Sequence, residues 1–317
     1  MRPEREICRQ VLAEHSKSFA LAGTLFPKAP RDDAAAVYAW CRRCDDAVDL
    51  AGPEAAPLSL ARLRAETGAI FGGKTLHDPI LREFREVAQQ RQIPRFYADE
   101  LLAGLQMDVD FVRFETVDDL LLYSYRVAGV VGLMMCHVMG VADPRALRHA
   151  AHLGMAMQLT NICRDVMEDW GRRHIYLPDE LLGAEAAGEL WAHRGEPLPR
   201  TLGAPIKRAV SGLLTQASAL YRSGDLGMRW LSWRCALAVR TAGLVYSAIG
   251  DMVAARGHDV WAGRAIVPPR HKLVFVGQAV ALGLFEAPAR LFRTSRHEVP
   301  ARALRFSEDL SGDRGLA

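Results

Sequence analysis

The sequence has few of the features that define several large classes of protein. Only six of its 317 residues are cysteines, too few for a disulfide scaffold in a chain of this length. Its charges are not of one sign, since 40 Lys and Arg nearly balance 37 Asp and Glu and leave a net charge of +3. A dedicated nucleic-acid binder needs a basic stripe for phosphate contacts, so we expect no nucleic-acid partner.

Long hydrophobic runs are missing as well. The most apolar stretch, residues 127–142, contains three glycines and one histidine and is shorter than the roughly 18 residues that a membrane span needs. The charged segment Met1–Glu6 has no apolar core and predicts no secretory signal. We therefore expect a cytoplasmic protein, with peripheral contact to the inner face of the cell membrane as an open alternative. That contact would come from the apolar and basic residues Leu291, Phe292, Arg293, Arg296, Arg302 and Arg305, for which a solvated tail is the simpler interpretation.

Alternating strand-like runs bounded by Asn-Gly or Asp-Gly turns are also absent. Apolar residues instead recur at spacings of three and four, over residues 7–19, 34–48, 58–71 and 80–88. Breaks such as the one at Gly52–Pro57 are short, and no long polar linker divides the chain. The sequence predicts an all-α fold of about ten helices, in one domain over residues 1–317, with residues 287–317 as a loosely attached C-terminal segment.

Two segments carry paired carboxylates at helical spacing. Asp45 and Asp49 are four residues apart, so both side chains lie on one face of a helix, and Asp165 and Asp169 repeat the spacing 120 residues later. A solvated helix end would be the simpler interpretation of a single pair. Two such helices facing each other would form a cradle for hard divalent cations.

The second pair belongs to a longer polar stripe, which Gln158 and Asn161 extend. A polar stripe on an otherwise apolar helix must face water or a polar cavity. Mg²⁺ fits such a cradle better than zinc or iron because it prefers oxygen ligands and keeps several waters, and Mn²⁺ is an alternative. Cys41 and Cys44 have no second C-x-x-C pair to complete a zinc site, so we interpret them as structural.

On these motifs the sequence resembles the squalene/phytoene synthase family of head-to-head prenyl transferases, and within it the bacterial phytoene synthases. The similarity runs from His15 to about Lys272 and is carried by residues 15–19 (HSKSF), 38–49 (YAWCRRCDDAVD), 125–132 (YRVAGVVG), 158–165 (QLTNICRD) and 176–178 (YLP). It implies a single-domain, all-α isoprenoid synthase fold whose helices surround a central cavity.

The resemblance also implies roles for individual residues. Asp45, Asp49, Asp165 and Asp169 would bind Mg²⁺ that bridges to substrate diphosphates, with Asn161 as a further ligand, and Tyr125 would line the cavity near the reacting carbons. The other substrate-binding residues would be Ser16, Ser18, Phe19, Tyr38, Arg42, Gln158, Arg164, Tyr176, Tyr246, Arg264 and Lys272. For Tyr246 and Arg264, ordinary helix-surface positions are an equally good interpretation.

Two segments depart from the family pattern. Many relatives have Gly-Arg-x-Tyr-Leu-Pro where this chain has residues 173–178, RHIYLP. We expect Arg172 and Arg173 to supply the charge there, with His174 titrating near neutrality as a partial substitute. At residues 267–272, VPPRHK replaces a Ser/Thr-rich turn, so the phosphate contacts of this segment stay open.

The activity implied by the resemblance is the condensation of two geranylgeranyl diphosphates to phytoene through prephytoene diphosphate. No strand-bounded glycine fingerprint for dinucleotides is present, and we expect no requirement for NADPH. Small side chains at Gly23 and Ala35, one helical turn from Phe19 and Tyr38, predict a deep cavity for twenty-carbon chains. The alternatives are a squalene, diapophytoene or hydroxysqualene synthase that uses farnesyl diphosphate, or a catalytically silent lipid-binding relative. Expected partners are prenyl diphosphates and downstream carotenoid enzymes.

Overall fold

The computed structural model describes residues 2–141 and 143–291, with the backbone alone at residues 269, 272, 273 and 284–291. Every regular element in these ranges is a helix, which confirms the all-α prediction. The described residues form fourteen α-helices instead of the expected ten, because several of the helices are short. Residues 292–317, which form most of the segment expected to be loosely attached and to offer the alternative membrane contact, lie outside the described residues.

The helices follow one another along the chain with short connections. The α-helices are α1 (Pro3–His15), α2 (Lys17–Leu25), α3 (Lys28–Asp49), α4 (Gly52–Phe71), α5 (Pro79–Gln90), α6 (Arg95–Val109), α7 (Val117–Ser124), α8 (Val130–Met139), α9 (Arg145–Gly171), α10 (Asp179–Leu182), α11 (Ala184–Ala192), α12 (Gly203–Gly227), α13 (Trp233–Ala255) and α14 (Pro269–Leu291). The shorter turns are η1 (Tyr125–Gly129), which is π-helical, and the 3₁₀ turns η2 (Arg200–Leu202), η3 (Met228–Trp230) and η4 (Val260–Ala262).

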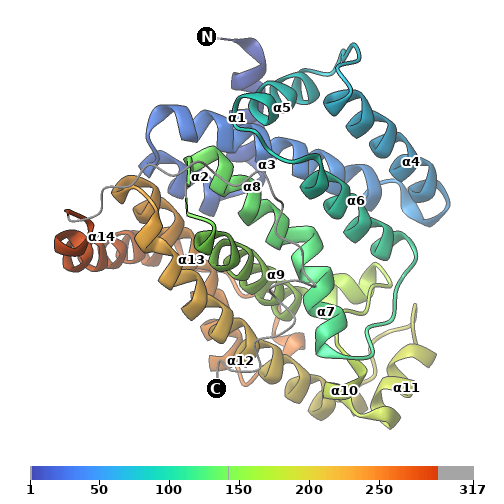
Figure 1. Cartoon of the computed structure of the whole chain (residues 1–317). Coiled ribbons are helices and arrows are strands. Elements are labelled where there is room, and N and C mark those ends of the chain that lie inside the picture. Colours follow the sequence, from blue (N-terminus) through green and yellow to red (C-terminus); the bar gives the residue numbers. More distant parts are fainter. Residues whose placement is uncertain (1, 142, 292–317) are drawn as a thin grey trace.

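Helix α9 lies in the middle of the fold (Figure 1). It packs against α8 and η1 on one side and against α12 and α13 on the other. Helices α4, α5 and α6 form the upper right part of the view, α3 and α8 lie near the upper centre, α14 lies at the left, α12 at the bottom, and α10 and α11 in the lower right corner. The largest cluster of buried apolar side chains runs from α1 to the segment before α14, so most of the described helices share one core.

Two helix starts differ from the expected ones. The periodic run over residues 7–19 is broken at Ser16, whose Oγ accepts a hydrogen bond from the backbone N–H of Phe19 at 3.2 Å and caps α2. The expected break at Gly52–Pro57 is not observed, because α4 begins at Gly52 with Pro53 in its first turn, where proline is tolerated. Asp78 caps the start of α5, since its Oδ1 accepts hydrogen bonds from the N–H groups of Ile80 and Leu81.

The segment from η1 to α8 approaches α9 closely because glycines stand at the contact. A Cβ atom added to Gly154 would lie 2.3 Å from the carbonyl oxygen of Ala128, and one added to Gly132 would lie 2.3 Å from that of Ala150. Both neighbours are backbone atoms, which cannot move aside as a flexible side chain can. The two glycines therefore set the distance between these helices.

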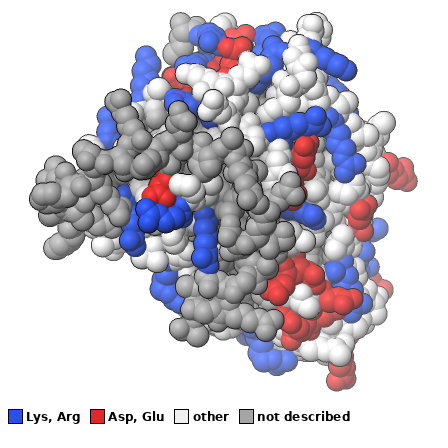
Figure 2. All heavy atoms as spheres, in the orientation of Figure 1, with Lys and Arg blue, Asp and Glu red and all other residues white. Residues whose placement is uncertain are grey.

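Two helical stretches, Val117–Met139 and Trp233–Ala255, are long and apolar enough to cross a membrane by length and composition. Both are mostly buried within the fold, as core helices of a soluble protein also are. The surface in Figure 2 carries both basic and acidic side chains, with the acidic ones gathered mainly in the lower right part. This mixture agrees with the small net charge of the sequence.

The glycine contact predicts the effect of one added methyl group. Gly154→Ala is expected to lower the free energy of unfolding by about 1–3 kcal/mol or more, since the methyl group would overlap the backbone of Ala128. Urea unfolding of the purified variant measures this change. Gly188→Ala on α11 is the matched control: nothing lies within 4 Å of its added Cβ, so stability should stay equal or rise by up to about 1 kcal/mol. Equal stability of the two variants would contradict the proposed packing constraint.

Candidate active site

A cavity of about 310 Å³ runs along α9, with walls from α2, α3, η1, α8, α12 and α13. Its lining is mainly apolar, and its polar groups include Asp45, Gln158, Asn161 and Tyr246 at one end. The lining follows α9 from Asn161 back to Ala146, fifteen residues or about 22 Å at the rise of an α-helix. The central cavity expected from the sequence is therefore present, and it is long and narrow.

The two acidic pairs lie at the ends of α3 and α9, and Asp108 on a third helix, α6, raises the pKa of one carboxyl in each pair. Burial raises the pKa of Asp45 to about 8, and the like charges of Asp49 and Asp108 add to the shift. The pKa of Asp169 is also raised well above its usual value, by burial first and then by Asp165 and Asp108. Carboxylates from α3, α6 and α9 thus face one another in a poorly solvated place.

Asp108 on α6 is the main site residue that the sequence analysis missed. Its Oδ1 accepts a hydrogen bond from the Tyr176 hydroxyl at 2.7 Å, and its Oδ2 accepts one from the Tyr123 hydroxyl at 3.2 Å. Burial raises its pKa to about 7, although both hydrogen bonds act to lower it. The sequence feature that could have identified Asp108 is its position on the apolar stripe of α6, where it follows the buried Leu101 by seven residues and the buried Leu105 by three.

Arginines partly neutralise these carboxylates. Arg172 Nη1 lies 3.1 Å from Asp49 Oδ2, so the end of α9 is tied to the end of α3. Arg164 donates to Asp165 through its Nε at 2.7 Å, and Arg264 contacts the same carboxylate at 3.1 Å. The structure thus brings the guanidinium of Arg264 to the second acidic pair. Arg172 brings positive charge to the first pair.

The donor groups at this end of the cavity fit a hard divalent cation. All candidate ligands carry oxygen, and the buried Oδ1 of Asn161 has no hydrogen-bond partner, so a cation would satisfy an otherwise orphaned polar atom. Among the described side chains, no group of three or more His, Cys, Asp and Glu could hold a metal by itself. The arrangement suits Mg²⁺, which takes one or two protein carboxylates and completes its shell with water and phosphate oxygens.

An aromatic wall lies beside the carboxylates. Phe19 stacks on Tyr246 with ring centroids 5.2 Å apart and meets Tyr38 edge-on at 6.0 Å, and all three line the cavity. Ser16 forms a hydrogen bond with Tyr246 in addition to capping α2. Four residues expected to bind substrate therefore meet at one place, although they come from three different helices and the turn before α2.

Tyr125 and Ala35, which were both predicted to line the cavity, do not reach its wall. Tyr125 is fully buried at the start of η1, and Val127 and Ala128 after it line the cavity instead. The π-helical turn changes the helical register, so its side chains lie on a different face of the helix from the one expected for an α-helix. Ala35 is also fully buried but is not in the lining, whereas its neighbour Ala34 is, because one helical residue turns the side chain by about 100°. Gly23 does line the cavity, as expected.

One expectation about charge needs correction. His174 was expected to titrate near neutrality, but burial and the nearby Arg194 and Arg172 lower its pKa to about 4, so it is neutral at pH 7. Its ring lies parallel to that of Tyr176, with centroids 5.7 Å apart. Arg42 donates to Asp46 at 3.0 Å and lines a separate groove between α1, α3 and α4, although its charge still lowers the pKa of Asp45.

The other predicted residues are placed as follows. Gln158 lines the cavity one helical turn before Asn161, and Ser18 is partly buried on α2 but is not in the lining. The side chain of Lys272 lies outside the described part of the structure. Cys41 and Cys44 are buried free thiols, in agreement with the structural interpretation of the C-x-x-C pair.

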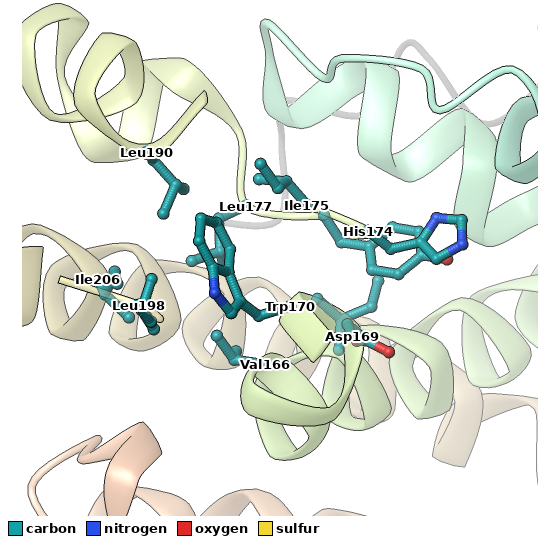
Figure 3. A pocket seen from close by; sticks show the side chains of 11 residues that line it. Val166, Asp169, Trp170, His174, Ile175, Leu177, Leu190, Leu198 and Ile206 are labelled. Carbon is teal, nitrogen blue, oxygen red and sulfur yellow. The ribbon is translucent and has the colours of Figure 1, made fainter. Parts of the chain in front are cut away.

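A small apolar pocket anchors the end of α9 (Figure 3). The Trp170 side chain points towards Leu177 and Leu198, while that of Asp169 points to the other side. The indole N–H of Trp170 donates to the carbonyl oxygen of Glu196 at 2.7 Å, which holds the helix end in place. Trp170 thus fixes the end of the helix, while the adjacent Asp169 presents its carboxylate to the site.

Comparison with known proteins agrees with this geometry. Residues 12–271 match the sequence model of a family described as squalene/phytoene synthase. The chain belongs to the squalene/phytoene synthase family. Family members are enzymes that use prenyl diphosphates and generally depend on a metal. The matched range includes both acidic pairs, the aromatic wall and the Asp108 region.

Individual relatives cover nearly the whole chain. A phytoene synthase from Pseudescherichia vulneris is 39% identical over 92% of this chain and 94% of its own length. A 15-cis-phytoene synthase from Enterobacter agglomerans is 38% identical over 84% of this chain and 92% of its own length. Among solved structures, a dehydrosqualene synthase in complex with a ligand has a TM-score of 0.78 at 28% identity, covering 88% of this chain and 96% of its own. The isoprenoid synthase fold expected from the sequence is confirmed.

The raised pKa of Asp45 predicts a pH-dependent stability in metal-free buffer. In the unfolded chain the Asp45 carboxyl loses its proton near pH 3.8, whereas in the folded protein it keeps the proton up to about pH 8. The free energy of unfolding should therefore fall as the pH rises between these values. Asp45→Asn removes this titration and should make the decline smaller. Urea unfolding across this pH range measures both slopes.

The control for this experiment is Asp99→Asn, at a carboxylate on α6 that is paired with Arg95 and half-exposed. It should keep the wild-type slope. Identical pH slopes for Asp45→Asn and the wild type would show that the carboxyl is not held protonated in the folded protein.

Proposed function

We propose that this family member is a phytoene synthase. It condenses two geranylgeranyl diphosphates head to head to phytoene through prephytoene diphosphate and releases both diphosphates. The observation that carries the proposal is the long apolar cavity with paired carboxylates and arginines gathered at one end. Relatives named phytoene synthase, at 35–39% identity over most of the chain, support the same activity.

The acidic pairs and the arginines near them bind the diphosphates. Asp45, Asp49, Asp165 and Asp169, with Asn161, would hold Mg²⁺ or Mn²⁺. When bound, the metal stabilises the negative charge that develops on a leaving diphosphate. Additional positive charge for the leaving groups comes from Arg42, Arg164, Arg172 and Arg264, as preorganised electrostatic catalysis requires.

The carbon chains lie in the apolar part of the cavity. Loss of diphosphate leaves an allylic cation, which water would quench, so the reaction needs a dry site. Phe19, Tyr38 and Tyr246 exclude water next to the carboxylates and present aromatic ring surfaces that attract cations. The same wall keeps the double bond of the second chain next to the ionised carbon, which is the positioning that a condensation needs.

The substrate preference follows from the length of the cavity. Its lining extends for about 22 Å along α9, and Gly23 leaves the α2 wall open beside Phe19. A twenty-carbon chain uses this depth, whereas a fifteen-carbon chain would leave its far part unfilled. The final carbocation is quenched by loss of a proton, so no NADPH is required. We place this activity in the cytoplasm, within one domain formed by residues 1–317, with delivery of product to downstream carotenoid enzymes.

Product analysis tests the proposal. The purified chain with Mg²⁺ and geranylgeranyl diphosphate should form phytoene without NADPH, as identified by chromatography and mass spectrometry. Asp165→Asn should lower kcat about 10²–10³-fold, the usual cost of removing one preorganised electrostatic group, while circular dichroism stays unchanged. Arg113→Gln, which changes a half-exposed residue paired with Asp179, should leave the rate unchanged. A product made only from farnesyl diphosphate would keep the reaction type but assign the shorter substrate.

A wall substitution tests the chain-length argument separately. Gly23→Phe should lower kcat/KM for geranylgeranyl diphosphate at least tenfold relative to farnesyl diphosphate, because the ring would fill the cavity beside Phe19. Competition between the two substrates measures the ratio directly. Gly188→Phe, where nothing lies within 4 Å of the added Cβ, should keep the wild-type ratio. An unchanged ratio in Gly23→Phe would place the determinant of chain length elsewhere in the cavity.

A further inference from the structure

The end of the cavity opposite the carboxylates lies directly beneath the protein surface. Met228 and Leu231 line this end, together with Ala146 and His149 from the first turns of α9. The residue after Leu231 is exposed, and so is Trp233 at the start of α13. The chain that lines this end of the cavity therefore reaches the protein surface within one or two residues of Leu231.

Large apolar side chains are exposed on this part of the surface. Trp233 is 66% exposed, and Leu226 near the end of α12 is 49% exposed. Exposing an indole and a leucine so close together in the chain is unfavourable in water, and tryptophan is typical of surfaces that meet the boundary of a bilayer. The two residues flank η3, the turn that covers this end of the cavity.

The partly buried Trp230 holds this turn in place. The indole N–H of Trp230 donates to Asp143 Oδ2 at 2.9 Å, and its ring stacks on His149 with centroids 5.3 Å apart. The guanidinium groups of Arg229 and Arg145 lie over the same ring, at 5.1 and 5.7 Å from its centroid. Trp230 thus fixes two arginines beside the exposed apolar residues.

The charged residues around these apolar side chains are mainly basic. Arg222, Leu226 and Arg229 follow at steps of four and three, so they share one side of the chain as α12 passes into η3. Arg234 donates to the carbonyl oxygens of Leu25 and Phe26 at 3.3 Å, which ties the start of α13 to the end of α2. The neighbouring acidic groups are neutralised, Asp143 by Arg145 at 2.6 Å and Asp225 by Arg240 at 2.8 Å.

We propose that this surface, formed by Arg222, Leu226, Arg229, Trp233 and Arg234, docks the protein on an anionic lipid bilayer. The arginines meet lipid phosphates, and Trp233 and Leu226 enter the boundary between headgroups and acyl chains. The far end of the cavity then lies against the membrane. One consequence rests on the proposed function: a hydrocarbon product can pass from this end into the acyl chains without crossing water.

Vesicle flotation without substrate tests the docking surface independently of the reaction. The full chain should float with vesicles of phosphatidylglycerol and phosphatidylethanolamine, and much less with phosphatidylcholine or at high salt. The double variant Trp233→Ser and Leu226→Ser should weaken binding at least tenfold. Arg222→Gln with Arg229→Gln should weaken it roughly fivefold per arginine.

The matched control is Leu50→Ser with Leu58→Ser, which removes two leucines that are 79% and 76% exposed at the end of α3 and on α4. It should float like the wild type, and circular dichroism checks that every variant is folded. Absence of flotation by the wild type, as expected for a surface that binds another protein, would overturn the proposal. So would wild-type flotation of the Trp233 and Leu226 variant, or an equal loss in the control.

A second readout concerns release of product. With substrate and anionic vesicles, the Trp233 and Leu226 variant should keep the single-turnover rate of the wild type but show a lower steady-state rate. Equal steady-state rates would overturn the route through this end of the cavity. Absence of any product from the wild type would refute the proposed function, while the flotation result would still decide the docking surface.

Discussion

The mutual repulsion of buried carboxylates is the constraint on which the site depends. Asp45, Asp108 and Asp169 stand on three different helices. Burial raises the pKa of each carboxyl, and the charge of Asp108 adds to the shift at Asp45 and at Asp169. Such a group is costly unless protons, hydrogen bonds or cations compensate it. The hydrogen bonds from tyrosines to Asp108 and the contact between Arg172 and Asp49 provide part of that compensation, and a bound cation would provide the rest.

Keeping these groups together requires a rigid centre, which α9 provides. Glycines at its contact with η1 and α8 allow backbone to approach backbone, and the Trp170 pocket fixes its far end. One helix therefore carries both the second acidic pair and much of the cavity wall. Its position determines where the diphosphates and the carbon chains can lie relative to each other.

The two acidic pairs could be predicted from spacing alone, because carboxylates four residues apart share a helical face in any context, whereas the aromatic wall and the arginines followed from the family resemblance. The signal for Asp108 was weak, a single carboxylate on the apolar stripe of α6, and its role is defined by tyrosines of other segments that meet it only in the fold. The neutral state of His174 depends on burial and on Arg194, which is distant in sequence. The prediction for Ala35 failed because Ala34 and Ala35 are equally small but lie on different faces of α3, and only Ala34 lines the cavity.

The π-helical turn η1 allows one continuous stretch of helix to serve two purposes. The backbone N–H of Val130 bonds to the carbonyl oxygen of Tyr125, five residues earlier, so the turn accommodates one residue more than an α-helix would. Before it, Tyr123 faces Asp108, and after it Val131 and Met135 face the carbon chains. A strictly α-helical version of this segment would rotate one half against the other by about 100°, so it could supply either the polar contact or the apolar wall, but not both.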